Sequence, residues 1–269
     1  MPAEDLRTIF DEDPERYDRA RPGYPAELFG DLGELTDIGP GARVAEVGPG
    51  TGQATTTLVA SGAHVVAVEL GAGLAAVLRR RLAGTSVEVV VSAFEDWSLP
   101  AEPFDAVTAF TAWHWLDPAI RAAKAAAALR PGGALATVTT VHVSGGTEEF
   151  FADVQACYER WDPSTPVGVR LPAADAVPPG LDEVDTSDLF APAVRRHYQQ
   201  DISYPTRGYL ELLATYSGHR ALTPLRRQGL FSCIAALIEG TYGGIITKRY
   251  LYELRVARRR PPGRRGRSG

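Results

Sequence analysis

Three glycines stand at alternate positions directly after a short apolar run that ends at Val47. They are Gly48, Gly50 and Gly52, and Glu46 lies within the run just ahead of them. Glycine has no Cβ, so this spacing lets a ligand approach the backbone closely. A helix beginning after the glycines would offer free N–H groups to the same ligand. Glu46 suits a ligand that carries an ammonium group, because its carboxylate would repel a phosphate.

The glycine spacing excludes one common ligand class. In a dinucleotide site with the pattern G-x-G-x-x-G the third small residue would fall on Gln53, which does not fit. The pattern that fits is E-x-G-x-G-x-G. Glu69 ends the next apolar run, 19 residues beyond Gly50, and a carboxylate there can accept hydrogen bonds from both hydroxyls of a ribose. The two features together predict a ligand that joins an ammonium group to a nucleoside.

A second set of polar and aromatic residues follows the apolar run at 106–110. This set, in the stretch TAWHWLD, is Trp113, His114 and Trp115. His114 could serve as a general base, since a neutral imidazole accepts a proton near pH 7. The alternative is that His114 and the two tryptophans form a packed wall that positions cofactor and substrate.

His219 is a second candidate for the general base. It lies beside Tyr216 in the stretch ATYSGHRAL, at the expected end of a helix. If this helix end caps the pocket, Tyr216 and His219 would contact the substrate; otherwise they lie at the protein surface. The remaining histidines have no metal-ligand spacing, and we expect no metal site.

The elements that must position these residues alternate between short β-branched runs and longer runs rich in Ala and Leu. Several of the short runs are apolar at consecutive positions, which is typical of parallel strands covered on both faces. The pattern predicts an α/β fold, a Rossmann-like, doubly wound and mostly parallel seven-stranded sheet with helices on both faces. The predicted strands are 43–47, 64–68, 87–91, 106–110, 134–141, 194–202 and 245–256, and the predicted helices between the first five are 53–60, 73–83 and 119–129.

Further helices are expected to cap this sheet from the front and from the second half of the chain. They are predicted at 14–20, 25–35, 148–160, 206–217 and 223–239, with a loop at 161–181 that could act as a lid. We expect a single domain at 1–256 and a disordered basic tail at 257–269. Within the domain we assign 1–40 to cap helices, 41–141 to the cofactor-binding half, and 142–256 to the substrate and cap half.

The charge and composition of the chain exclude several classes of binding partner. The 269 residues carry a net charge of −5, although the last stretch is rich in arginine, so the body is more acidic than the total. This argues against a nucleic-acid partner, whose phosphates require clustered Lys and Arg. No apolar stretch approaches the length of a membrane span, and the start lacks a signal-peptide layout. We expect a cytoplasmic protein whose Cys157 and Cys233 are buried, inert thiols without a disulfide.

From Tyr17 to Val138 the sequence resembles the class I S-adenosylmethionine-dependent methyltransferases of the small-molecule type. The matching segments are YDRARPGYP, VAEVGPGTGQAT, VVAVEL, VVVSAFEDWSL, FDAVTAFTAWHWLD and LRPGGALATV. The resemblance implies S-adenosylmethionine as cofactor, S-adenosylhomocysteine as product and a small-molecule methyl acceptor as partner. The later part of the chain is similar to the more variable substrate region of these enzymes.

The resemblance also implies roles for single residues. Glu46 and the three glycines would face the methionine part of the cofactor, and Glu69 would hold the ribose. Many relatives have an Asp in a G-D-A triplet where this chain has Ser92-Ala93-Phe94, so we expect the adenine to be contacted mainly by backbone. The other implied cofactor residues are Tyr17 and Arg21 at the methionine carboxylate, Phe94 and Glu95 near the adenine, and Leu70 and Thr111. The implied substrate residues are Trp113, His114, Trp115, Tyr216 and His219.

Three functions remain open from the sequence. The first is methylation of O, N or C on a small molecule, natural products included. The second is methylation of RNA or protein, and the third is a cofactor-binding, cyclase-like or regulatory protein that transfers no methyl group. Residue types and spacing give no signal for the oligomeric state.

Overall fold

The computed structural model describes residues 7–261, and these divide into two compact units. The sheet unit consists of Gly23–Thr139, Pro179–Tyr198 and the described chain from Glu253 onward. The helical unit consists of the described chain up to Pro22, Thr140–Pro178 and Gln199–Tyr252. The assignment of 1–256 to one domain stays a prediction.

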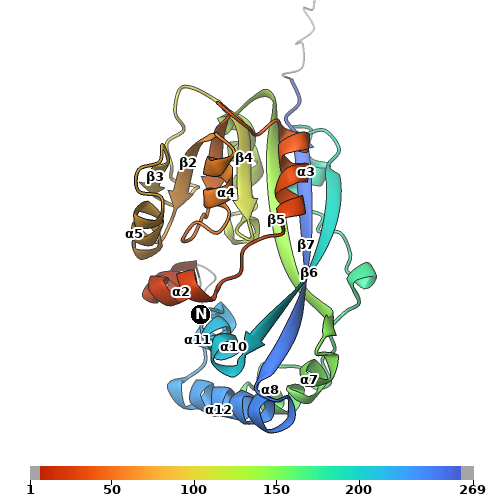
Figure 1. The fold of residues 1–269 in the computed structure, drawn as a ribbon. Helices are drawn as coiled ribbons and strands as arrows, with labels where there is room; N and C mark the ends of the chain where they lie inside the picture. Colours follow the sequence, from red (N-terminus) through yellow and green to blue (C-terminus); the bar gives the residue numbers. More distant parts are fainter. Residues whose placement is uncertain (1–6, 262–269) are drawn as a thin grey trace, which may run out of the picture. The chain divides into compact units, whose positions relative to one another are not determined.

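The seven strands form one mixed sheet in the order β3-β2-β1-β4-β5-β7-β6 (Figure 1). β1 pairs in parallel with β2 and β4, and the pairs β2–β3 and β4–β5 are also parallel. One strand of the sheet is antiparallel. The predicted α/β, mostly parallel sheet is therefore confirmed. The strands are β1 (Arg43–Val47), β2 (His64–Glu69), β3 (Glu88–Val91), β4 (Phe104–Phe110), β5 (Leu129–Gly146), β6 (Val194–Pro205) and β7 (Ile245–Arg258).

The strand order reverses direction between β1 and β4. From β1 the chain passes outward through β2 to β3, whereas from β4 it passes to β5 on the other side. Because strand-helix-strand connections are right-handed, this reversal places α6 on the face opposite α4 and α5. Open α/β sheets bind ligands at such a switch point, outside the carboxyl ends of the strands. The helices here are α3 (Ala26–Thr36), α4 (Thr55–Ala60), α5 (Ala72–Arg81) and α6 (Arg121–Ala128).

The core of the sheet unit explains the consecutive apolar positions. Every residue of β1 after Arg43 is buried, and so are most residues of β4. Phe94, Trp97 and Phe104 form a run of ring contacts in this core, with centroids 6.3 and 5.9 Å apart. Burying such rings contributes a large share of the apolar stabilisation, so the strand ends are held rigidly.

The helical unit contains the cap elements. α12 packs against α8 and α10, and α10 packs against α2. The predicted helix at 148–160 is divided at Val154 into α7 and α8, and the one at 206–217 ends at Leu213 as α10, with the short α11 starting at Ser217. None of the described helices has the length and apolarity needed to cross a membrane. The elements are η1 (Ile9–Glu12), α2 (Pro14–Ala20), α7 (Glu148–Asp153), α8 (Gln155–Trp161), η3 (Ala174–Ala176), α10 (Thr206–Leu213), α11 (Ser217–Arg220) and α12 (Pro224–Thr241).

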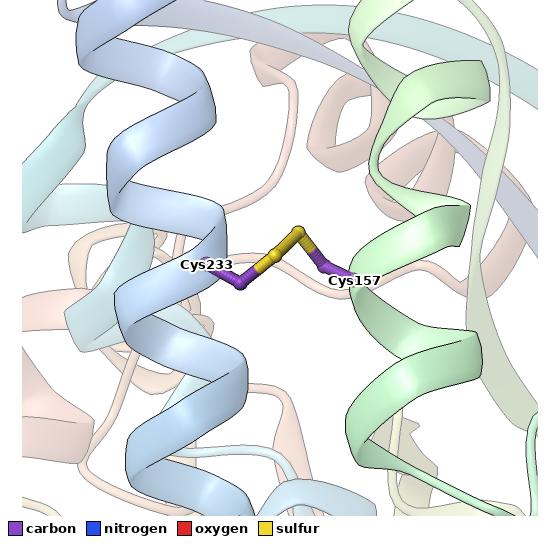
Figure 2. Close-up of a disulfide and its surroundings, with 2 residues drawn as sticks. All are labelled: Cys157 and Cys233. Carbon is purple, nitrogen blue, oxygen red and sulfur yellow. A yellow bond between two sulfur atoms is a disulfide. The ribbon is translucent and has the colours of Figure 1, made fainter.

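The expectation of two free thiols was wrong. Cys157 of α8 and Cys233 of α12 form a disulfide, with their Cα atoms 5.8 Å apart (Figure 2). The two cysteines are 76 positions apart in sequence, so spacing gave no sign of their contact. The bond links two helices that already pack together.

Two boundaries also differ from the prediction. The strand predicted at 134–141 begins earlier, because β5 starts at Leu129, and its pairing with β4 has an irregular register between Phe104 and Ala106. Assigning residues 257–259 to a disordered tail was wrong, because β7 continues through Arg258 and Arg259 bridges to Phe190. Residues 262–269 lie outside the described part of the chain.

Candidate functional site

The glycine-rich turn lies between β1 and α4 at the switch point. Gly48, Gly50 and Gly52 all have positive φ angles, of 64°, 60° and 97°, which side chains other than glycine rarely adopt. A Cβ on Gly48 would come within 2.6 Å of the Ala112 Cβ, and one on Gly52 within 2.6 Å of Leu78 Cδ1. Two of the three glycines are therefore required by packing inside the sheet unit, and not only by the approach of a ligand.

Glu69 holds this turn against the end of β2. Its Oε2 accepts a hydrogen bond from the backbone N–H of Gly50 at 2.9 Å, and its Oε1 accepts one from Gly71 at 2.8 Å. The side chain is almost fully buried. A carboxylate oxygen has more than one lone pair, so these contacts are compatible with a further bond to a hydroxyl group. Leu70, between Glu69 and Gly71, is half-buried.

Glu46 is a buried carboxyl group within β1. It is fully shielded from solvent, and neither side-chain oxygen has a hydrogen-bond partner among the described residues. Burial raises the pKa of Glu46 to about 7, Thr55 opposes this shift, and the charge of Glu69 adds to it. A buried acceptor without a donor is costly, which indicates that a donor is supplied from outside the chain.

The end of β4 brings Thr111 to the same edge of the sheet. Thr111 has a positive φ of 54°, which is uncommon for a residue with a side chain, and its N–H donates to Val138 O at 2.7 Å. Its hydroxyl lies 3.2 Å from the hydroxyl of Tyr24. Backbone strain of this kind concentrates at functional sites.

The segment after β3 is fixed by its neighbours. Phe94 is buried, and Lys124 donates to the backbone carbonyl of Glu95 at 2.7 Å. The Glu95 carboxylate accepts a hydrogen bond from the N–H of Asp117 at 2.9 Å. The backbone at 94–95 is thus well positioned, while this contact orients the Glu95 side chain toward the loop before α6.

The residues of the WHW stretch form a 3-10 turn, η2 (Trp113–Trp115), and they differ in how far each is exposed to solvent. Trp113 is buried, and its indole N–H donates to Asp182 at 2.9 Å. His114 is exposed and lies against the half-buried Trp115, with ring centroids 5.0 Å apart. Desolvation, and then the charge of Arg121, lower the pKa of His114. Its imidazole is therefore neutral near pH 7, as a general base requires, but it is a weaker base than usual.

A buried ionic network behind this turn could not be recognised from the sequence. Arg255 of β7 is bound by Asp182 at 2.7 Å and by Asp185 at 3.0 Å. Arg121 of α6 is bound by Glu183 at 2.5 Å and also donates to Trp113 O at 2.6 Å. The two arginines lie more than 60 positions from their carboxylate partners in sequence. This network fixes Trp113, which supports the turn that carries His114.

The helical unit brings its own predicted residues together. The guanidinium of Arg21 lies over the rings of Tyr17 and Tyr216, at 5.0 and 4.9 Å, and donates to Thr215 O at 2.9 Å. The rings of Tyr216 and His219 are 5.7 Å apart. Burial lowers the pKa of His219 to about 4, an effect that Asp162 opposes and Lys248 strengthens. His219 is thus a poor general base near pH 7.

The predicted residues therefore form two groups, each within one unit. The sheet unit gathers the glycine turn and the ends of β1, β2 and β4 at one edge of the sheet. The helical unit gathers Tyr17, Arg21, Tyr216 and His219. The roles of all these residues toward cofactor and substrate remain predictions.

Comparison with known proteins identifies the class of the sheet unit. Residues 44–133 match the family described as a methyltransferase domain. This segment contains the glycine turn, Glu69 and the η2 turn. The chain thus carries a class I S-adenosylmethionine-dependent methyltransferase domain, whose cofactor is S-adenosylmethionine.

The chain is similar to an uncharacterized methyltransferase of Mycobacterium tuberculosis, with 39% identity over 122 residues. That match covers 45% of this chain and 48% of the relative, so the chain spans about half the length of the curated relatives it matches. A solved protein of Anaeromyxobacter dehalogenans, assigned to the type II methyltransferases, is 25% identical with a TM-score of 0.57 and covers 90% of this chain and 99% of its own. Phosphoethanolamine N-methyltransferase 2 of Haemonchus contortus, solved with phosphomonomethylethanolamine and S-adenosylhomocysteine, is 14% identical with a TM-score of 0.56, covering 95% of this chain and 60% of its own.

The residues of the sheet unit fit this cofactor. Glu46 is a buried acceptor with no donor among residues 7–261, as a methionine ammonium group requires, and it lies in the strand that leads into the glycine turn. Glu69 lies at the end of the neighbouring strand. An ammonium group at Glu46 and a ribose at Glu69 stay the predicted roles of these two carboxylates.

Proposed function

We propose that the protein transfers the methyl group of S-adenosylmethionine to a small-molecule acceptor on oxygen, nitrogen or carbon. The observation that carries this proposal is the buried carboxyl of Glu46, which has no hydrogen-bond partner in the described part of the chain and lies beside the glycine turn that Glu69 holds. When bound, the cofactor supplies an electrophilic methyl group on its sulfonium. The net charge of −5 supports a small acceptor over a polyanionic one.

The chain's own contribution is mainly to hold the reactants and exclude water. Well-oriented reactants can gain on the order of 7–11 kcal/mol over free encounter, so methyl transfer does not require a strong base. Both candidate bases, His114 and His219, have lowered pKa values. We infer that alignment is the larger effect, and that an acidic acceptor would lose its proton most easily.

The test is release of S-adenosylhomocysteine from S-adenosylmethionine by the full chain over a panel of small acceptors, followed by mass spectrometry. Acceptor-dependent release with a mass gain of one methyl group supports the proposal. Cofactor binding without release over the small-molecule panel, an RNA pool and a protein pool would favour a cyclase-like or regulatory role. Release with RNA or protein alone would move the acceptor to a macromolecule.

A cytoplasmic location stays part of the proposal and has one observation against it. Disulfides are rare in reducing compartments, and this chain has Cys157 bonded to Cys233. Alkylation of the protein in fresh lysate, before any oxidation, tests the point. Two alkylated thiols agree with a cytoplasmic location, and an intact bond contradicts it.

A further inference from the structure

Asp182 binds the indole of Trp113 from outside the segment that matches the methyltransferase family. It directly precedes α9 (Glu183–Thr186), whereas the family match ends at residue 133. Its Oδ2 accepts the hydrogen bond of the indole N–H at 2.9 Å, and its two oxygens also accept from the guanidinium of Arg255, at 2.7 and 2.9 Å. All three residues lie within the sheet unit. The indole is therefore held by a part of the chain that the family match does not include.

The carboxylate of Asp182 is ionised near pH 7 and is held in one orientation. Burial alone would raise the pKa of Asp182, but the hydrogen bonds and the charge of Arg255 outweigh burial and lower it. The side chain of Arg255 is 5% exposed, and salt screens such a buried pair only weakly. The N–H of Val184 also donates to Asp182 Oδ1 at 3.0 Å, so Asp182 caps α9 at the same time. These contacts aim the remaining acceptor at the indole.

Arg121 holds the backbone and the ring of the same tryptophan. It donates to the Trp113 carbonyl at 2.6 Å, and its guanidinium lies over the Trp113 ring at 5.2 Å. Glu183, the residue after Asp182, accepts from Arg121 with both carboxylate oxygens, at 2.5 and 2.9 Å. Trp113 is thus fixed at its indole N–H, at its ring and at its carbonyl, and the segment that begins at Asp182 supplies or orients each of these contacts.

Trp113 is joined to the glycine turn through its chain neighbour Ala112. The Cβ of Ala112 lies 2.6 Å from the position that a Cβ on Gly48 would take, so these two residues are packed directly against each other. Thr111, the residue before Ala112, has the positive φ of 54°. A strained backbone conformation persists only where the surrounding structure holds it. The contacts of Trp113 therefore hold the residues after β4 against Gly48.

We propose that Asp182 is a positioning residue for the cofactor, which acts through Trp113 and Ala112 to hold the glycine turn in its binding conformation. Asp182 does so without contacting the ligand itself. The inference rests on the cofactor site at the ends of β1, β2 and β4, and it adds a residue outside the family match on which cofactor affinity depends. Changes along such a chain of packed side chains alter affinity by about two- to thirtyfold.

Calorimetric titration of the full chain with S-adenosylhomocysteine tests the inference. Trp113→Phe keeps an aromatic ring and removes only the N–H donor, whereas Asp182→Ala removes the acceptor. We expect each variant to bind about five- to tenfold more weakly than wild type, and the double variant to bind no more weakly than Asp182→Ala, because both changes remove the same hydrogen bond. Asp185→Ala is the matched control, since Asp185 also binds Arg255, at 3.0 Å, but forms no hydrogen bond with Trp113 among the described residues. It should leave the affinity unchanged.

Hydrogen exchange without ligand separates positioning from general stability. Gly50 donates its N–H to the end of β2, so exchange in the segment 48–52 reports whether the turn keeps its conformation. Exchange there should be about fivefold faster in Trp113→Phe and in Asp182→Ala, and unchanged in Asp185→Ala, even where all three changes lower the melting temperature.

The outcomes distinguish this inference from the cofactor site on which it rests. If wild type and Trp113→Phe bind S-adenosylhomocysteine equally, or if exchange at 48–52 rises as much in Asp185→Ala as in Trp113→Phe, the contact only stabilises the fold and the inference is wrong. Trp113→Phe decides the question alone if Asp182→Ala does not fold. If wild type binds no S-adenosylhomocysteine, the cofactor site fails together with the inference.

Discussion

Glu69 accepts a hydrogen bond from the backbone N–H of Gly50 at 2.9 Å, which joins the end of β2 to the turn after β1. The same carboxylate accepts from Gly71 on its other oxygen. One side chain thus orders the turn in addition to its proposed role toward the ribose. Replacing it should disturb both.

We expect Glu69→Ala to weaken binding of S-adenosylhomocysteine by at least tenfold, because a charged hydrogen bond to the ribose and the support of the turn are lost together. Isothermal titration calorimetry gives the dissociation constant. Glu88→Ala, at an exposed position at the start of β3, is the matched control and should leave the affinity unchanged. Unchanged affinity in Glu69→Ala would remove the ribose assignment.

The buried Glu46 should make cofactor affinity depend on pH. Its pKa is raised from 4.5 to about 7 by burial, so only the ionised form above this range pairs with the methionine ammonium. Affinity for S-adenosylhomocysteine should therefore rise as the pH increases from 6 to 8 and then level off. In Glu46→Gln the affinity should be lower and nearly independent of pH over this range. A wild-type affinity that falls toward pH 8 contradicts the assignment.

The same shift has a consequence for stability without ligand. Since the pKa of Glu46 is higher in the folded chain than in the unfolded chain, the folded state keeps this proton longer. The contribution of Glu46 to the free energy of unfolding is fully present below about pH 4.5, and it is lost as the pH rises through about 7. Glu46→Gln should thus raise the melting temperature more at pH 8 than at pH 5. An equal change at both values would show that Glu46 is ionised or paired in the folded chain.

His114→Ala should lower kcat by less than tenfold and raise the KM for the acceptor, because we expect the exposed ring to position ligands beside Trp115. Steady-state kinetics at pH 7 separate kcat from KM. A general base contributes about 10²–10⁴-fold, and because the pKa of His114 is lowered, its protonation would reduce the rate only below the usual pH range of histidine. If His114→Ala lowered kcat by about 10²-fold or more without changing KM, and if its rate no longer fell at acidic pH, His114 would be identified as the base.

Cys157→Ser should reduce the free energy of unfolding by about 2–4 kcal/mol, because a disulfide that closes a long loop restricts the unfolded chain. Denaturant unfolding with and without dithiothreitol measures this. The reductant should destabilise wild type and leave Cys157→Ser unchanged. Equal sensitivity of both proteins to the reductant would show that the bond does not stabilise the fold.

The sheet was predictable because its signals are local. Each strand is a short apolar run, and parallel pairing buries both faces, so the runs at 43–47 and 106–110 correspond almost position for position to β1 and β4. The division at Val154 was not predictable, since residues 148–160 include helix formers throughout. The spacing of Glu46, the glycines and Glu69 indicated the ligand because consecutive strand ends meet at one edge of a parallel sheet.

Long-range partners account for what the sequence did not reveal. The disulfide, the network around Arg255 and the pairing of Lys248 with Tyr216 each join residues at least 32 positions apart, and no local pattern encodes these contacts. The packing of Gly48 against Ala112 is of the same kind. Burial is also a property of the folded chain. The structure was therefore needed to show that Glu46 is shielded from solvent and has no hydrogen-bond donor among the described residues.

We propose that the sheet edge formed by the ends of β1, β2 and β4 holds S-adenosylmethionine. Calorimetric titration of the full wild-type chain with S-adenosylhomocysteine at pH 8 tests it most directly. We expect saturable binding at one site per chain, and binding at least tenfold weaker in Glu46→Gln. No binding to wild type, or equal binding to wild type and Glu46→Gln, would contradict it.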